Sequence, residues 1–388
     1  MKIGCCLAYY KNHNNYGTSL QGYATVKVLQ SMGHDVRIIK YRKCDSVVRK
    51  LRVAPLQIIS GGLKAYQRKL KKERMIKRKD WYAADICTRT NSNNSFKDKQ
   101  MEPLCDIYYG YKALQKGSLN YDAVLVGSDQ VWTPLGLYSN FFNLMFANDN
   151  VRKISYASSF GVGVIPFWQR QATGKYLDRI DYLSVRELKA KEIVEALSHK
   201  KAQVVCDPTL LRTRDDWASE FASLTPKADG KYIFCYILGD NVDTRAEIIQ
   251  FAKAKGQKIV ALRHVDEFLE CDESFGDECP YDVTPLEFIQ LINNAKYVFT
   301  DSFHCSVFSI LFNKQFVTFY RFNNTSKNSR NSRIDSLFNL FGLSERLYDG
   351  NLIDQADRII DYVSVNKKVE QLRLESLDFL KRALKVHE

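Results

Sequence analysis

The sequence has no long apolar run. No stretch of its 388 residues approaches the roughly 18 uninterrupted apolar residues that a membrane-spanning helix needs. The apolar residues 1–8 form a short run that lacks both an extended basic region and a convincing cleavage site. We therefore expect a buried first strand there rather than a signal peptide, and a cytoplasmic protein.

Paired cysteines of the kind that hold metals are also missing. Ten cysteines are present, but none forms a C-x-x-C pair, and Cys206 and Cys235 lie within apolar, strand-like runs. This placement predicts reduced, mostly buried thiols rather than disulfides. The spacings of carboxylates and cysteines do not indicate a metal site either, so we expect no metal.

Positive charge is concentrated in one segment. Residues 40–80 contain 15 Lys and Arg but only three Asp and Glu, so this segment accounts for nearly all of the net charge of +13. One interpretation is a solvated helix face, and another is a surface for an anionic membrane or a lipid-phosphate-linked substrate. Nucleic acid is the least favoured partner, because no stacking aromatic side chains alternate with these charges.

Short apolar runs alternate with helical patterns along nearly the whole chain, which is typical of an α/β protein with parallel sheets. Two such series follow one another. They predict two Rossmann-like domains facing a cleft, formed by residues 1–222 and residues 223–388. The alternation of strands and helices is interrupted over residues 45–115, where we expect a basic helical excursion from the first sheet. Closing helices are expected over residues 354–385.

Hydrophobic periodicity predicts the individual elements. In the first half, strands are expected over residues 2–8, 34–40, 121–126, 153–158 and 181–185. In the second half, they are expected over residues 232–238, 258–262, 297–300 and 316–320. Helices are expected over residues 17–32, 244–255, 284–293 and 302–312.

The segment 300–314 combines the end of a strand with the immediate start of a helix. The first backbone N–H groups of that helix then point beyond the sheet, where α/β proteins bind ligands and especially anions. Asp301 and Ser302 are natural N-cap residues, and His304 follows in the first turn. We favour a histidine that transfers protons beside a bound anion over one that merely caps or packs.

The same segment carries a family resemblance. The run Asp301-Ser302-Phe303-His304, with residues 307–310 and 312–314, resembles the signature of polysaccharide pyruvyl transferases. Further segments resemble this family in the same order, namely Asn15-Tyr16-Gly17 with residues 20–24, and residues 127–132, 155–161, 184–187 and 207–211. The resemblance extends over roughly residues 1–345.

This resemblance implies an architecture like that of the GT-B glycosyltransferases. It also implies phosphoenolpyruvate as the donor substrate, with no separate cofactor, and a cyclic pyruvyl ketal on a surface-polysaccharide sugar as the product. We expect the acceptor to be a galactose or N-acetylhexosamine on a polyprenyl-diphosphate-linked precursor, bound by the first domain. The basic segment 40–80 would then bring the enzyme to the inner face of the membrane.

The resemblance further implies that His304 is catalytic, because it matches the histidine of the family's Arg-Leu-His-type motif. Ser302 stands in place of that arginine, so another cation must hold the donor, and Ser302 and Phe303 are themselves expected to bind substrate. Candidates are Arg186, from the family's Ser-x-Arg-Glu motif, and Arg321 and Arg333 from the following loops. Each of these arginines has an ordinary alternative as a surface or loop residue.

Other candidate binding residues follow predicted strand ends. Gly17, after Asn15, would allow close approach of a substrate or simply form the turn that starts a helix. It has no G-x-G-x-x-G spacing and therefore does not indicate a dinucleotide site. Asp129 would accept a hydrogen bond from an acceptor hydroxyl or cap a short helix. His264 would serve as a second acid or base, or be a surface histidine.

Two other functions stay open at this point. One is a GT-B glycosyltransferase that uses a nucleotide sugar. The other is a non-catalytic protein of polysaccharide assembly, or a nucleic-acid-binding protein that depends on the basic segment. Stabilisation by phosphoenolpyruvate but not by nucleotides would separate the pyruvyl transferase from the first alternative.

Overall fold

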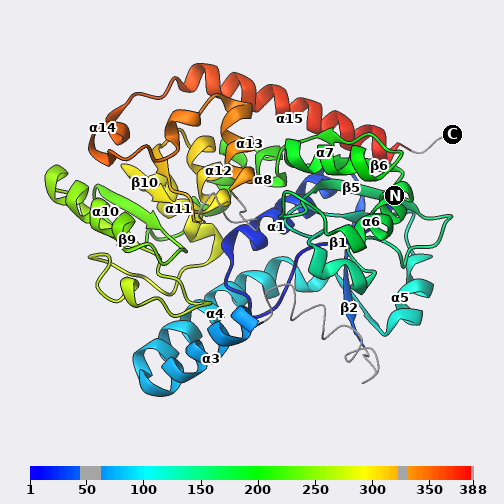
Figure 1. Cartoon of the computed structure of the whole chain (residues 1–388), viewed down its shortest axis with the longest axis horizontal. Coiled ribbons are helices and arrows are strands. Elements are labelled where there is room, and N and C mark those ends of the chain that lie inside the picture. The colour runs from blue at the N-terminus through cyan, green and yellow to red at the C-terminus, as the bar shows by residue number, and fades with distance from the viewer. Residues whose placement is uncertain (44–62, 322–330, 386–388) are drawn as a thin grey trace.

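The computed structural model describes residues 1–43, 63–321 and 331–385. A seven-stranded parallel sheet forms the first half, with the strand order β3-β2-β1-β4-β5-β6-β7 (Figure 1). Its strands are β1 (Lys2–Cys6), β2 (Asp35–Arg42), β3 (Cys105–Tyr109), β4 (Ala123–Val126), β5 (Arg152–Ser158), β6 (Tyr182–Val185) and β7 (Gln203–Val204). The expected buried first strand is confirmed, because β1 lies at the centre of this sheet.

A four-stranded sheet forms the second half, with the order β11-β10-β8-β9. Its strands are β8 (Tyr232–Tyr236), β9 (Lys258–Ala261), β10 (Tyr297–Thr300) and β11 (Gln315–Thr318), and all of their pairings are parallel. The predicted α/β class with two Rossmann-like sheets is confirmed. Parallel strands covered by helices on both faces read as continuous apolar runs, which is why the sequence shows them clearly.

The excursion after β2 is only partly helical. It contains α3 (Leu63–Arg78) and α4 (Asp80–Gln100), but the chain then returns to the first sheet as β3, paired in parallel with β2. The prediction of a helical excursion over all of residues 45–115 is therefore wrong for residues 105–109. As an edge strand, β3 is only partly buried and lacks a strong apolar run. Residues 44–62 lie outside the described residues.

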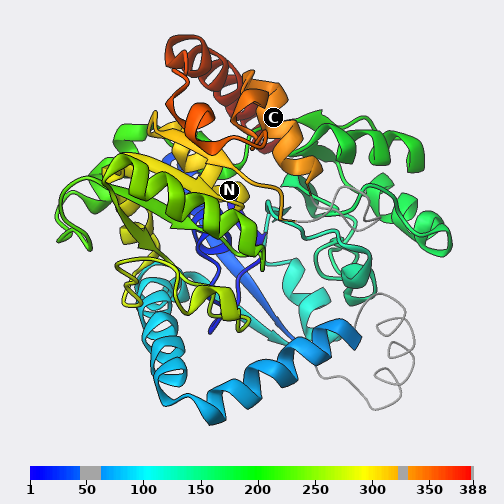
Figure 2. The ribbon, with the colours of Figure 1, turned by 60° about the vertical axis from the view of Figure 1, so that its left-hand side comes forward.

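Helices α3 and α4 reach from the first half to the second (Figure 2). Arg68 and Lys71 on α3 lie 3.1 Å and 3.5 Å from the carboxylates of Glu267 and Glu270. Arg89 on α4 is buried and donates hydrogen bonds to backbone oxygens at residues 280 and 281. Part of the basic segment therefore packs against the loop that follows β9.

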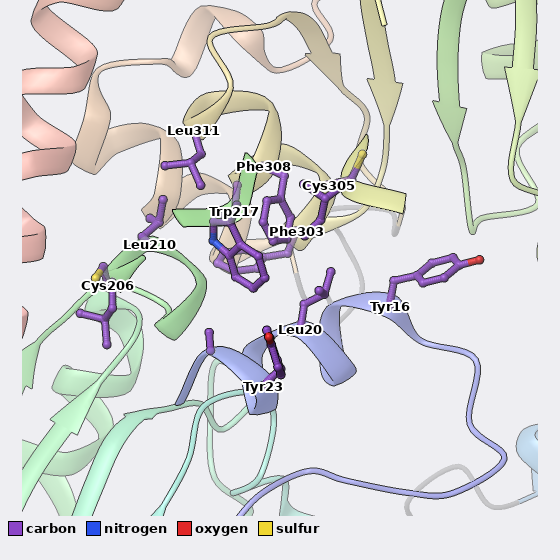
Figure 3. Packing of buried hydrophobic residues seen from close by; sticks show 14 of the residues in the cluster. Tyr16, Leu20, Tyr23, Cys206, Leu210, Trp217, Phe303, Cys305, Phe308 and Leu311 are labelled. Carbon is purple, nitrogen blue, oxygen red and sulfur yellow. The ribbon is translucent and has the colours of Figure 1, made fainter. Parts of the chain in front are cut away.

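A buried cluster joins the two halves at their centre (Figure 3). It contains Tyr16 and Tyr23 of α1 (Tyr16–Ser31), Phe308 of α12 (Phe303–Leu311) and Trp217 of α9 (Arg214–Phe221). The Trp217 ring lies 6.1 Å from that of Tyr23 and 5.3 Å from that of Phe308. The first helix of the first half thereby packs against the helix that carries His304.

The C-terminal helix α15 (Tyr362–Leu384) returns to the first half (Figure 1). Its Ser376 hydroxyl accepts a hydrogen bond from the backbone N–H of Cys206, and Arg152 of β5 donates one to the backbone oxygen of Ala383. The closing helices expected over residues 354–385 are present as α14 (Leu352–Asp357) and α15. The domain boundary between residues 222 and 223 stays a prediction.

Nine cysteines lie in the described ranges, and all nine are free thiols. Among these described residues, no group of three or more His, Cys, Asp or Glu side chains is arranged to hold a metal. No helix of the described ranges is long and apolar enough to cross a membrane.

Candidate functional site

The site is built around His304, which lies at the start of α12 directly after β10. Its side chain is almost completely buried and faces Gly17 in the first turn of α1. A Cβ atom built on Gly17 would lie only 2.1 Å from Nδ1 of His304, so no other residue fits there without moving the imidazole. The predicted close approach at Gly17 is thus an approach by a protein side chain.

Asp207 holds the other side of His304. Its Oδ2 lies 3.6 Å from Nε2 of His304 and accepts hydrogen bonds from Arg186 at 2.8 Å and from the Ser128 hydroxyl at 2.9 Å. Its Oδ1 accepts hydrogen bonds from the backbone N–H and the hydroxyl of Thr209. Asp207 is the N-cap of α8 (Pro208–Leu211), so the backbone itself fixes the direction of the carboxylate.

Asp207 is ionised over the whole physiological range. Burial alone would raise its pKa, but the charges of His304 and Arg186 and the hydrogen bond from Arg186 outweigh burial and hold the pKa of Asp207 well below its ordinary value. A permanently charged carboxylate therefore lies 3.6 Å from Nε2 of His304. The pair is therefore suited to proton transfer.

Arg186 is buried at the end of β6, and its guanidinium stacks on the ring of Phe303. Its guanidinium carbon lies 4.3 Å from the centre of the Phe303 ring, and its Nε lies 3.6 Å from a carboxylate oxygen of Glu187. Nε and Nη2 of Arg186 have no hydrogen-bond partner in the described part of the chain. Two N–H donors of the charged Arg186 guanidinium, at Nε and Nη2, are therefore available inside the site.

Arg333 of α13 (Ser332–Phe341) is a second cation at the same ring, with its guanidinium carbon 5.8 Å from the centre of Phe303. Burial and the nearby Arg186 lower the pKa of Arg333 to about 9, so it stays protonated at neutral pH. Within the described ranges it makes no hydrogen bond or ion pair, and its Nε is buried. An anion at this position would supply the missing partner.

Arg321 is engaged differently. Its Nη2 donates hydrogen bonds to the backbone oxygen and to Oδ1 of Asp301, at 3.0 Å and 3.1 Å. The Asp301 carboxylate also accepts hydrogen bonds from the backbone N–H groups of Leu238 and Gly239. Asp301 therefore ties the loop after β8 to α12 and does not cap the helix, so its expected N-cap role is wrong.

Ser302 does occupy the N-cap position of α12, but its side chain makes no capping hydrogen bond. Its own backbone N–H donates to the Thr300 hydroxyl. In the part of the chain that the structure describes, no acceptor meets the N–H groups of the first helical turn. These donors and the two arginines converge beside Phe303, which suits a small anion.

Asp129 comes into the same cluster with a left-handed backbone conformation (φ 77°). Its Oδ2 accepts a hydrogen bond from the Thr18 hydroxyl at 2.9 Å. Burial would raise its pKa, but Arg186, His304 and Arg333 together hold the pKa of Asp129 below its ordinary value. No helix starts at Asp129, so the interpretation as a helix cap is wrong.

Two predicted site residues have structural partners instead. Asn15 is the N-cap of α1, and its side chain accepts a hydrogen bond from the backbone N–H of Thr18. Nδ1 of His264 accepts a hydrogen bond from the backbone N–H of Glu267. Burial lowers the pKa of His264. No hydrogen bond or ion pair within the described ranges joins His264 to His304.

Sequence reasoning missed the supporting polar residues of the site, above all Asp207 and Ser128. Both lie in segments that carry the family resemblance, but neither is remarkable in isolation. The usable signal is an acidic residue directly before a proline at a strand end, in Asp207-Pro208. Such a residue is a strong N-cap, and its carboxylate then lies at the same sheet edge as the helix that carries His304.

Comparison with known sequences identifies a family. A sequence model of the family described as polysaccharide pyruvyl transferase matches residues 15–323. The matched range includes Gly17, Asp129, Arg186, Asp207 and His304. No curated protein gives a significant match to this sequence.

Solved structures of similar shape are distant in sequence. UDP-GlcNAc 2-epimerase from Neisseria meningitidis is 10% identical, with a TM-score of 0.48, covering 97% of this chain and 99% of that chain. The epimerase from Methanocaldococcus jannaschii is 13% identical, with a TM-score of 0.45 and coverages of 92% and 98%. MurG from Acinetobacter baumannii is 8% identical, with a TM-score of 0.44 and coverages of 98% and 99%.

Proposed function

This chain belongs to the polysaccharide pyruvyl transferase family, and on that premise we propose that it transfers a pyruvyl group from phosphoenolpyruvate to a sugar of a surface-polysaccharide precursor. The observation that carries the proposal is the convergence of buried His304 with two incompletely partnered arginines, Arg186 and Arg333, at the start of α12. The product is a cyclic ketal, and phosphate is released.

Phosphoenolpyruvate is small and carries a phosphate and a carboxylate. Guanidinium forks and oriented backbone N–H groups bind such groups best. Arg333 and the first turn of α12 supply these donors, and the free Nη2 of Arg186 adds another. Because Arg186 is already paired with Asp207 while Arg333 is not, Arg333 takes the larger share of the donor's charge in this proposal.

The reaction needs one proton on carbon and one on phosphate. C3 of phosphoenolpyruvate takes up a proton and becomes a methyl group, and C2 becomes an electrophilic, oxocarbenium-like centre. One sugar hydroxyl bonds to C2, the C2–O bond to phosphate breaks, and a second hydroxyl closes the ketal. The two hydroxyl protons end on C3 and on the released phosphate, so atoms and charges balance.

His304 moves the proton in this scheme, and Asp207 positions it. The charged carboxylate lies beside Nε2 of the imidazole, and Gly17 lets the ring lie close to α1. Positioning a catalytic group in this way removes orientational freedom before the reaction starts. Asp129 lies on the acceptor side, held by Thr18, and would accept a hydrogen bond from a sugar hydroxyl.

The test compares His304→Ala with His199→Ala, a matched removal of an exposed histidine in the turn after α7 (Leu188–Leu197). We expect His304→Ala to lower phosphate release in the presence of acceptor at least a thousandfold, with an unchanged circular dichroism spectrum. His199→Ala should keep full activity. Turnover by His304→Ala close to that of the unaltered protein would refute the assignment.

Donor choice is tested by thermal stabilisation. Phosphoenolpyruvate should raise the melting temperature, and UDP-sugars should not. Arg333→Ala should abolish the shift, while Arg321→Ala, which removes a side chain engaged with Asp301, should reduce it less. Stabilisation by nucleotide sugars alone would favour a glycosyltransferase, and salt-sensitive nucleic-acid binding without turnover would favour a non-catalytic role.

We also propose that the acceptor is linked to polyprenyl diphosphate and that the enzyme works at the inner membrane face as a peripheral, cytoplasmic protein. The support is the set of exposed cations on α3 that pair with no carboxylate in the described ranges, Arg74, Lys77 and Arg78. Arg68 and Lys71, by contrast, pair with Glu267 and Glu270. Only part of the basic segment is therefore available to lipid.

A further inference from the structure

A pocket with a volume of about 500 Å³ lies at the carboxyl ends of β1 and β2. The segment after β1, the end of β2 and residues from the loop 136–142 line it. In α/β proteins this edge of a sheet is the usual place for ligands, and pockets of about 300–1,000 Å³ hold small molecules. The mechanism above assigns it no role.

Aromatic rings form much of the pocket wall, from Tyr9, Tyr10, Tyr41, Phe141 and Phe142. Tyr10 is 52% exposed, so its ring is accessible to a ligand in the pocket. Rings of this kind offer a flat apolar face together with, for tyrosine, a polar edge. Such a wall suits a sugar ring, which has apolar faces and polar edges of its own.

The charged lining is of one sign, with four cations and no carboxylate among its described residues: Lys11, Lys40, Arg42 and Lys43. Lys11 is paired with Asp98 at 3.0 Å, and Lys40 with Glu102 at 2.5 Å. Arg42 and Lys43 form no ion pair within the described ranges. Two unpaired cations at the mouth of an aromatic pocket match a ligand with adjacent negative charges, such as a diphosphate.

The pocket is connected to the catalytic cluster by two short segments. Tyr10 of the pocket lining precedes Gly17, which faces His304, by seven residues, and Asp129 precedes Gly136 of the lining by seven residues. Burial, and after it the charge of Asp129, raises the pKa of Tyr10, which agrees with the closeness of these two residues. The pocket and Asp129 therefore lie at the same edge of the first sheet, after neighbouring parallel strands.

From this arrangement we infer that the pocket is the acceptor subsite and holds the diphosphate and first sugar of a lipid-linked saccharide, with Arg42 and Lys43 on the diphosphate and Tyr10 on the sugar. The inference rests on the proposed function and adds the location and chemical class of the acceptor. A nucleoside diphosphate sugar has the same charged and ring-bearing chemistry, so the experiment must separate the two.

The experiment measures binding of farnesyl-diphosphate-linked N-acetylglucosamine, UDP and free N-acetylglucosamine by calorimetry. We expect the lipid-linked sugar to bind and both other probes to bind at least tenfold more weakly. Arg42→Ala/Lys43→Ala should weaken binding of the lipid-linked sugar at least tenfold. The matched control Lys175→Ala/Lys201→Ala, which removes two exposed lysines outside the lining, should leave it unchanged.

Stacking is tested separately with Tyr10→Ala and Tyr10→Phe. The alanine variant should weaken binding about tenfold, and the phenylalanine variant should retain it because the ring is kept. Equal affinity of the Arg42→Ala/Lys43→Ala variant and the unaltered protein, or displacement of the probe by UDP at equal concentration, would overturn the inference.

A donor measurement on the same proteins keeps the two proposals apart. Stabilisation by phosphoenolpyruvate should be the same with and without Arg42 and Lys43, because neither lies in the His304 cluster. If phosphoenolpyruvate stabilises none of the proteins while the lipid-linked sugar binds in the pocket, the proposed donor is wrong and the acceptor subsite stands.

Discussion

At the scale of single residues, the contact between Gly17 and His304 is the tightest constraint in the site. Because a Cβ atom on Gly17 would lie 2.1 Å from the imidazole, even alanine must displace the ring or separate α1 from α12. Displacing a catalytic group by about 1 Å typically costs about a hundredfold in rate. In the proposed mechanism, a larger residue at position 17 would therefore lower the rate without touching a substrate.

We predict that Gly17→Ala lowers phosphate release about a hundredfold while the protein stays folded. The matched control is Gly22→Ala on the same helix, where the new Cβ would meet the flexible end of Met101 at 3.1 Å and that of Leu7 at 3.6 Å. Initial-rate measurements with both variants and circular dichroism check the prediction. Equal activity of the two variants would show that the imidazole has room to move.

Asp207 links the site to stability. Its pKa in the folded protein lies below its ordinary value of about 3.8, so folding favours the ionised form. This contribution is fully present above pH 4 and is lost as the pH falls further, since the unfolded chain takes up the proton first. Protonation of Asp207 is therefore one cause of the stability that the protein loses on acidification.

We predict that Asp207→Asn lowers the free energy of unfolding by about 3–5 kcal/mol at pH 7, because it leaves Arg186 buried without its partner. The difference in the free energy of unfolding between the variant and the unaltered protein should become smaller as the pH falls from 4 to 2.5. Urea unfolding followed at several pH values measures both effects. A difference that is constant over this range would contradict the assignment.

At the scale of elements, α3 has two kinds of cations. Arg68 and Lys71 form ion pairs with glutamates of the loop after β9, and Lys69 pairs with Glu73 of α3 itself. Arg74, Lys77 and Arg78 are exposed and lack a carboxylate partner among the described residues. Exposed ion pairs contribute about 0.2–1 kcal/mol each and weaken with salt. The ion pairs of α3 with the second half are therefore weak and are screened by salt, and the remaining cations of the helix are exposed to solvent.

We predict that Arg74→Ala/Lys77→Ala/Arg78→Ala weakens binding to vesicles of anionic phospholipid by about a hundredfold, at about 1 kcal/mol per cation. Turnover of a water-soluble acceptor should be unchanged. The control is the triple variant Lys175→Ala/Lys201→Ala/Lys367→Ala, which removes equal charge elsewhere on the surface. Vesicle sedimentation that shows equal binding of both variants would refute a membrane role for α3.

At the scale of the whole molecule, the two sheets share a core. The cluster around Trp217 contains side chains of α1, α9 and α12, and α15 returns from the second half to pack on the first (Figure 3). Neither half can unfold without exposing apolar surface of the other. Burial of this shared surface couples the stability of the two halves.

We predict a single cooperative transition in calorimetry, with both halves unfolding together. Trp217→Ala should lower the midpoint markedly, since truncating a fully buried tryptophan costs about 3–5 kcal/mol. Two separate transitions in the unaltered protein would show that the halves are independent and would support the predicted boundary at residues 222 and 223.

Most strands and helices were predictable from the sequence, because buried parallel strands are short apolar runs and helices have a 3.6-residue period. The strand β3 was not, since a half-exposed edge strand has neither signal. His304 was predictable from its place between a strand end and a helix start. Its partner Asp207 was not, because the two are separated by 97 positions in the numbering, and nothing local to either of them sets their separation.

The sequence by itself determined the α/β class, the family and the position of the central histidine, since each depends on local pattern and motif order. Only the tertiary structure decided which charges meet. It pairs Arg186 with Asp207 and Arg321 with Asp301, and it leaves Arg333 as the cation beside Phe303 with no partner in the described ranges. The reason is physical: charge pairing depends on distance through space, and the packing of α1 against α12 sets those distances.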